Sequence, residues 1–141
     1  MTAHAMDIRV YYEDTDAAGM VYHARYLAYA ERGRAELLRH AGVPHEDLVR
    51  QEGLIFVVRR IEIDYLRPAR LDEVLRLTTA PVRMTAASAR LQQDFALAGS
   101  GAVVARAVVD LACVRGADGR PSRIPARWRQ AFDEVTREST G

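Results

Sequence analysis

The sequence contains no lysine and no asparagine, and its single cysteine is Cys113. One cysteine excludes an internal disulfide and a metal site built from several cysteines. Because Cys113 lies in the apolar run 108–114, we expect it to be buried as a small hydrophobic residue rather than to act as a nucleophile. No apolar stretch approaches the length of a membrane helix, and residues 1–10 show no signal-peptide pattern. We therefore expect a cytoplasmic protein without membrane insertion.

An excess of charge of one sign is also missing, because 20 basic and 19 acidic residues leave a net charge of +1. The composition thus gives no argument for a nucleic-acid partner. All the basic residues are arginines, for which codon bias is the simple explanation and bidentate phosphate binding the alternative. A chain of 141 residues with 49% hydrophobic residues is typical of one globular domain, here residues 1–141.

Hydrophobic periodicity predicts one long helix followed by a run of strands. The predicted strands are residues 7–12, 54–66, 71–82, 88–97 and 102–115. The main helix is predicted at 24–41, with Gly42 after it, and a shorter helix at 45–51 ends at Gly53. A further amphipathic helix follows Pro125 and carries Trp128 and Phe132.

This element order indicates an α+β fold with an antiparallel sheet. Gly33 interrupts the main helix and costs about 1 kcal/mol relative to alanine, so we expect it to pack closely against another backbone. One helix cannot cover both faces of a five-stranded sheet, and we expect dimerisation to cover the second face.

The segment 12–26 concentrates the reactive side chains of the chain. It places Asp14, Asp16, Gly19 and His23 immediately before the main helix. The unpaired N–H groups of a helix N-terminus suit an anion or a developing oxyanion. A carboxylate facing such a terminus has the parts needed for acyl transfer or hydrolysis. The structural alternatives are that Asp16 caps the helix and that Asp14 only accepts hydrogen bonds in the loop.

Residues 10–26 read Val-Tyr-Tyr-Glu-Asp-Thr-Asp-Ala-Ala-Gly-Met-Val-Tyr-His-Ala-Arg-Tyr. This block resembles the N-terminal signature of hotdog-fold acyl-CoA thioesterases of the 4-hydroxybenzoyl-CoA thioesterase type, in the branch associated with the Tol–Pal system. The similarity continues through residues 31–36, 56–60 and 64–73, and it weakens after Leu97.

The resemblance implies a hotdog fold, in which an antiparallel sheet of about five strands wraps around one long helix. It implies that Asp16 is the catalytic carboxylate, acting as a nucleophile or as a general base for water. The backbone N–H of His23 is the implied oxyanion donor, and the His23 ring is expected to orient water or substrate. Neither a cofactor nor a metal is expected. The family forms dimers that often pair into tetramers, so we expect a homodimer or homotetramer with active sites at the subunit interface.

The expected substrate is an acyl-CoA, and the expected substrate-binding residues are Gly19, Tyr22, Arg59, Arg83 and Arg123. Gly19 is expected to allow a positive φ or a close approach, and Tyr22 is expected either to pack or to line the acyl pocket. The three arginines are candidates for the phosphates of coenzyme A. An acyl carrier protein, whose acidic surface would meet exposed arginines, is the alternative carrier.

Two other functions compete with thioester hydrolysis. A hydratase acting on acyl thioesters is disfavoured because the chain has no His-x-x-Asn-like segment. A non-catalytic acyl-CoA-binding or scaffold protein is the alternative from another class. The joint presence of Asp16, Gly19 and His23 argues for the enzyme.

Overall fold

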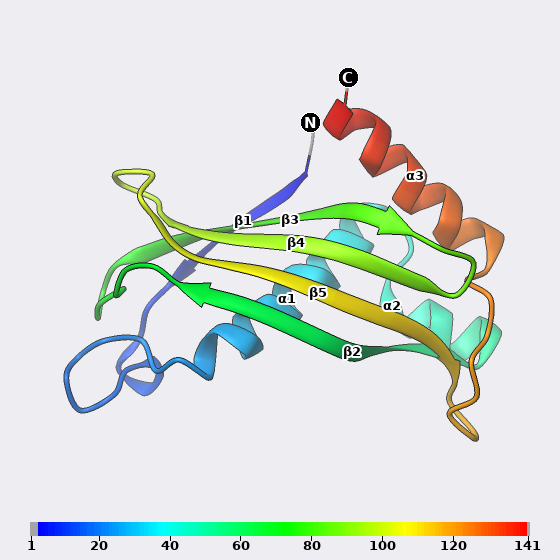
Figure 1. The fold of residues 1–141 in the computed structure, drawn as a ribbon, viewed down its shortest axis with the longest axis horizontal. Coiled ribbons are helices and arrows are strands. Elements are labelled where there is room, and N and C mark those ends of the chain that lie inside the picture. Colours follow the sequence, from blue (N-terminus) through cyan, green and yellow to red (C-terminus); the bar gives the residue numbers. More distant parts are fainter. Residues whose placement is uncertain (1–2, 141) are drawn as a thin grey trace.

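The computed structural model describes residues 3–140, with side chains described for 3–135, and contains one antiparallel sheet (Figure 1). Its strands are β1 His4–Arg9, β2 Leu54–Tyr65, β3 Val74–Met84, β4 Ser88–Leu97 and β5 Val103–Arg115. Their order across the sheet is β1-β3-β4-β5-β2, and every neighbouring pair is antiparallel. The predicted α+β class is confirmed, and β1 and β2 are the edge strands.

Five helical segments complete the described chain. They are η1 Tyr12–Asp14, α1 Arg25–His40, α2 His45–Asp47, η2 Leu48–Glu52 and α3 Ala126–Thr140. The main helix α1 differs from its predicted bounds by one residue at each end. Gly42 and Gly53 follow their helices with φ of 78° and 65°, the left-handed conformation that glycine adopts readily at a helix end.

The bounds of β1 and β3 differ from the predicted ones because each strand lies next to a turn that hydrogen bonds stabilise. β1 begins and ends three residues earlier than predicted, because the chain turns into η1 after Val10. The Asp14 carboxylate accepts the Tyr11 N–H at 2.9 Å and stabilises that turn. β3 begins three residues later than predicted, because Asp72 adopts φ of 72° and donates its N–H to the Val10 carbonyl at 2.9 Å.

The helices α1 and α3 cover the same face of the sheet. Leu37 of α1 and Trp128 and Phe132 of α3 belong to one cluster of buried residues with Leu91 of β4. Trp128 is 1% exposed, and its indole N–H donates to the Val43 carbonyl at 3.2 Å. None of the described helices is long and apolar enough to cross a membrane.

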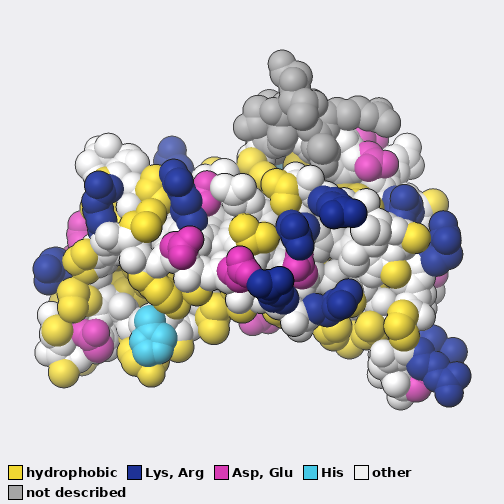
Figure 2. All heavy atoms as spheres, viewed as in Figure 1, with side chains coloured by type: hydrophobic (Ala, Val, Ile, Leu, Met, Phe, Trp, Pro, Cys, Tyr) yellow, Lys and Arg dark blue, Asp and Glu magenta, His cyan; other side chains and the backbone are white. Residues whose placement is uncertain are grey.

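The opposite face of the sheet is polar. Arg76 of β3 pairs with Asp7 of β1 at 3.0 Å, and Arg90 of β4 pairs with Asp110 of β5 at 2.7 Å. Figure 2 looks onto this face and shows basic and acidic side chains interspersed over it. Water can solvate such a face, so the face does not itself require cover by a second subunit, and dimerisation stays a prediction. The long strand β2 lies at an edge of the sheet, so the backbone N–H and C=O groups on its outer side have no neighbouring strand to pair with.

Gly33 lies at a close contact, as predicted, but the contact is with side chains rather than with a backbone. A Cβ at this position would lie 2.8 Å from Thr79 Oγ1. The buried Gln93 donates to Thr79 Oγ1 at 3.0 Å and to the Ala30 carbonyl at 2.9 Å, and it accepts from Arg34 at 3.1 Å. This network joins α1 to the middle of the sheet.

Cys113 is fully buried on β5, as predicted. Burial raises the pKa of its thiol, which makes the thiol a poor nucleophile at neutral pH.

Candidate active site

Asp16 begins a tight loop that returns at Val21, where a bridge between Thr15 and Val21 closes it. Its Oδ1 accepts the Ala18 N–H at 2.9 Å and the Met20 N–H at 3.2 Å. These bonds fix the carboxylate through one oxygen. The other oxygen, Oδ2, makes no hydrogen bond with any described residue and is left available for chemistry.

Gly19 provides the backbone conformation that this loop needs. It adopts φ of 78°, so the expectation of a positive φ is confirmed, and a Cβ there would meet no atom within 4 Å. Any residue with a side chain is strained in this conformation, whatever space surrounds it.

The N-terminus of α1 has no capping side chain. Its N-cap residue is Ala24, which makes no side-chain hydrogen bond, so the alternative that Asp16 caps this helix is wrong. The backbone N–H groups of His23 and Ala24 donate no hydrogen bond to any described residue. Free N–H groups at the positive end of a helix dipole form a favourable site for negative charge.

Asp14 has the structural surroundings that we expected for the second carboxylate. It is buried, and its Oδ1 lies 3.0 Å from Arg25 Nε. Arg25 also donates to the Glu13 carbonyl at 3.0 Å, which ties the start of α1 to the loop. Burial and the neighbouring Asp14 carboxylate raise the pKa of Tyr29. The two carboxylates of the motif therefore differ in kind, one buried and paired, the other exposed.

Asp16 borders two hollows of the surface. One, of about 310 Å³, is also lined by His23 and Tyr65. The other, of about 480 Å³, is also lined by Tyr22 and Ala24. The structure thus brings Asp16 and His23, the two predicted catalytic residues, to one hollow, and it places Tyr22 at the neighbouring one.

Aromatic rings surround the histidine of this site. The Tyr22 ring lies 4.5 Å from the His23 ring and is half exposed, so it packs on His23 with one side and faces solvent with the other. Tyr26 is 3% exposed and packs against Phe95 at 5.2 Å. The hydroxyl of Tyr65 donates to the His23 carbonyl at 2.8 Å. The sequence pattern indicated no role for Tyr65, although this residue lies in the segment 64–73 that resembles the thioesterase family.

The predicted arginines fall into two groups. Arg59 and Arg83 line one depression of about 470 Å³ on the polar face of the sheet, together with Arg60 and Arg90. The register of the strands shifts next to Arg60 and next to Arg83, and such irregularities bend a strand and increase its twist. Figure 2 shows basic side chains on this face. The exposed Arg123 does not line this depression.

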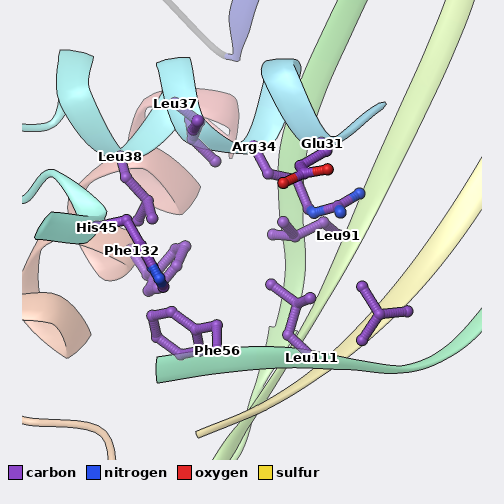
Figure 3. Close-up of a pocket in the computed structure, with 11 residues that line it drawn as sticks. Glu31, Arg34, Leu37, Leu38, His45, Phe56, Leu91, Leu111 and Phe132 are labelled. Carbon is purple, nitrogen blue, oxygen red and sulfur yellow. The ribbon is translucent and has the colours of Figure 1, made fainter. Parts of the chain in front are cut away.

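A cavity of about 390 Å³ lies between α1, β2 and α3 (Figure 3). Phe56 and Phe132 form part of its apolar wall, with ring centroids 6.1 Å apart. Glu31, Arg34 and His45 supply its polar groups. Because Phe56 belongs to the edge strand β2, the cavity lies beside the unpaired edge.

The histidines outside this site lie in other surroundings. The rings of His4 and His40 lie 5.5 Å apart. Burial lowers the pKa of His4. Within the described part of the chain, no group of three His, Cys, Asp or Glu residues is placed to hold a metal ion.

Comparison with known proteins identifies the family of this chain. The model of the thioesterase-like superfamily matches residues 10–132. Acyl-CoA thioesterase YbgC of Haemophilus influenzae is 38% identical over 128 residues, covering 91% of this chain and 93% of that protein. Acyl-CoA thioester hydrolase YbgC of Escherichia coli is 40% identical over 118 residues, covering 84% of this chain and 87% of that protein.

A solved structure supports the same relationship. The crystal structure of a probable thioesterase from Bartonella henselae superposes with a TM-score of 0.82 and 37% identity, covering 87% of this chain and 99% of that one. The chain therefore belongs to the thioesterase-like superfamily and has the hotdog fold.

Proposed function

We propose that this chain hydrolyses acyl-CoA thioesters to a free carboxylic acid and coenzyme A. The observation that carries the proposal is Asp16, whose Oδ2 lacks an intramolecular partner and which lies beside the uncapped N-terminus of α1. The YbgC relatives that match most of the chain are named acyl-CoA thioesterase and acyl-CoA thioester hydrolase.

Two routes are compatible with this site. In one, Asp16 attacks the thioester carbonyl carbon, the thiolate of coenzyme A leaves, and water hydrolyses the resulting anhydride. In the other, Asp16 takes a proton from a water molecule that attacks the carbonyl. In both, negative charge gathers on the carbonyl oxygen, where the His23 N–H donates a hydrogen bond. Loss of one such donor typically lowers the rate by about 10²–10³.

We propose further roles for three neighbours of Asp16. The His23 ring lines the hollow with Asp16 and is placed to orient water or substrate. Gly19 holds the loop in its positive-φ conformation, which lets the backbone approach the thioester closely. The half-exposed Tyr22 borders the second hollow and forms a wall for the acyl group.

We propose that the complete site forms in a homodimer, which is expected to pair into a homotetramer. A long unpaired edge such as β2 favours pairing with a second copy. If two β2 strands paired antiparallel, the Phe56 end of one strand would lie beside the Tyr65 end of the partner strand. The apolar cavity of one subunit would then lie beside Asp16 of its partner and receive the acyl group.

The predicted arginines would bind the coenzyme A part of the substrate rather than its acyl group. Arg59 and Arg83, grouped with two further arginines, suit the phosphates of coenzyme A, because guanidinium groups bind phosphate through paired hydrogen bonds. Arg123 lies apart from them and would contact phosphate only at a separate position. An acyl carrier protein would meet the same basic surface through its acidic residues.

Free-thiol release from short, long and aromatic acyl-CoAs, measured beside Asp16→Asn, tests the proposal. We expect wild-type turnover on one class and a loss in kcat of roughly 10³-fold or more in the variant. Coenzyme A binding, measured by calorimetry, should persist. Asp133→Asn on the exposed side of α3 is the matched control and should behave as wild type.

The outcomes separate the two functional classes. If no thioester is cleaved although coenzyme A binds, the chain is better described as a non-catalytic binding or scaffold protein. If Asp16→Asn is as active as the wild type, the assignment of Asp16 fails while the hydrolase function stands.

A further inference from the structure

Tyr65 makes a long-range hydrogen bond to the start of the active-site helix. It is the last residue of β2, and its hydroxyl donates to the carbonyl of His23 at 2.8 Å, across 42 positions of sequence. No part of the proposed chemistry above uses this bond. Its acceptor belongs to the His23–Ala24 peptide group, immediately before α1.

The surroundings of Tyr65 hold its ring and leave its hydroxyl protonated. The ring packs edge-on against Tyr26, with centroids 5.5 Å apart, and lies 6.3 Å from the His23 ring. Tyr65 is 46% exposed, so its hydrogen bond does not belong to the buried core. A phenol is protonated and can donate at neutral pH, and partial desolvation raises the pKa of Tyr65 further.

The hydrogen bond from Tyr65 to the His23 carbonyl determines the direction of the Ala24 N–H. A trans peptide is planar, and its C=O and N–H point in opposite directions. When Tyr65 holds the His23 carbonyl on its own side, the Ala24 N–H must point away from Tyr65. Tyr65 and His23 line one hollow beside Asp16, whereas Ala24 lines the other hollow that Asp16 borders. The Ala24 N–H has no acceptor among the described residues.

We propose that Tyr65 is a positioning residue that orients the His23–Ala24 peptide and makes the Ala24 N–H a second oxyanion donor, beside the N–H of His23. This inference rests on the proposed thioesterase function. The hydrogen bond to the carbonyl also polarises the peptide, because linked hydrogen bonds strengthen one another. Tyr65 acts through the peptide and does not itself touch the reacting atoms.

Tyr65→Phe tests the inference because it removes the hydroxyl and retains the ring that packs on Tyr26. We expect kcat to fall about 10-fold, less than the loss from deleting a donor, because the Ala24 N–H remains but is less well oriented. KM, the Kd for coenzyme A and the thermal midpoint should stay within the error of the wild type. Tyr12→Phe, at an exposed tyrosine that lines neither hollow, is the matched control and should leave every value unchanged.

A spectroscopic measurement separates this role from a structural one. In Asp16→Asn protein, a ¹³C-labelled thioester carbonyl reports its hydrogen bonds through its infrared stretching frequency. Adding Tyr65→Phe should move the band to higher frequency, because one donor is weakened. Adding Tyr12→Phe should leave the band where it was.

Two results would overturn the inference while leaving the proposed function intact. The first is wild-type kcat in Tyr65→Phe with an unchanged carbonyl band. The second is a parallel decline of kcat, coenzyme A binding and thermal midpoint, which would mark Tyr65 as a structural residue. Absence of any thioester cleavage by the wild-type protein would instead overturn the proposed function, and the inference with it.

Discussion

Replacing Gly33 by alanine would place a methyl group inside the contact between α1 and the sheet. The new Cβ would lie 2.6 Å from Leu77 Cδ2, 2.8 Å from Thr79 Oγ1 and 3.0 Å from Gln93 Nε2. All three neighbours are fully buried, and the Gln93 amide is held by hydrogen bonds to the Ala30 carbonyl and Thr79. The ends of Thr79 and Gln93 cannot move without disturbing the hydrogen bonds that join them to each other and to Ala30.

Two opposing effects determine the change in the free energy of unfolding. Alanine is favoured over glycine in a helix interior by about 1 kcal/mol. Overpacking of a well-filled core costs about 1–3 kcal/mol, and each displaced hydrogen bond of Gln93 adds roughly 0.5–1.5 kcal/mol. The unfavourable effects exceed the helix preference, so Gly33→Ala should destabilise the protein by roughly 1–3 kcal/mol.

Urea unfolding at one fixed protein concentration measures this difference, since the stability of an oligomer depends on concentration. Gly99→Ala is the matched control, because a Cβ there would meet nothing within 4 Å and its φ is not positive. It should change the free energy by less than about 0.5 kcal/mol. A Gly33→Ala protein as stable as the wild type would show that the neighbours relax freely, which would refute the reasoning.

Three further outcomes follow from the structure. Arg25→Gln should lower the free energy of unfolding by about 1–3 kcal/mol in urea titrations, because it leaves the buried Asp14 carboxylate without its ion pair; an unchanged midpoint would contradict this. Because burial raises the pKa of Cys113, its thiol stays protonated below that pKa and should react with a chromogenic disulfide at pH 8 only after unfolding; rapid labelling of the folded protein would count against it. Arg59→Ala combined with Arg83→Ala should raise KM for acyl-CoA but not for the matching N-acetylcysteamine thioester, which has no phosphates, and equal effects on both substrates would exclude phosphate binding.

The sequence by itself determined the local features of the structure, which depend only on residues close together in the chain. The bounds of β4 agree with the prediction at both ends, and those of α1 differ by one residue at each, because alternation and helical periodicity are local patterns. Gly42 and Gly53 end their helices because glycine alone adopts the left-handed conformation without strain. The Asp16 loop closes on its own backbone within five residues.

The resemblance to the thioesterase family predicted more of the active site than the residue pattern alone. It favoured Asp16 over a capping role, and the structure shows that Ala24, not Asp16, is the N-cap of α1. The resemblance also separated Asp16 from Asp14, but the burial of Asp14 and its ion pair with Arg25 required the fold, because they depend on the packing of the loop.

Contacts between distant segments were decided only by the tertiary structure. The bond from Tyr65 to His23 and the grouping of Arg59 with Arg83 join residues that no local pattern relates. Such pairs depend on the strand order β1-β3-β4-β5-β2 and on the register of each pair. A shift of one residue in register reverses the face on which a side chain lies. The sequence therefore determined which groups are available for chemistry, and the packing of the sheet against α1 decided which of them meet.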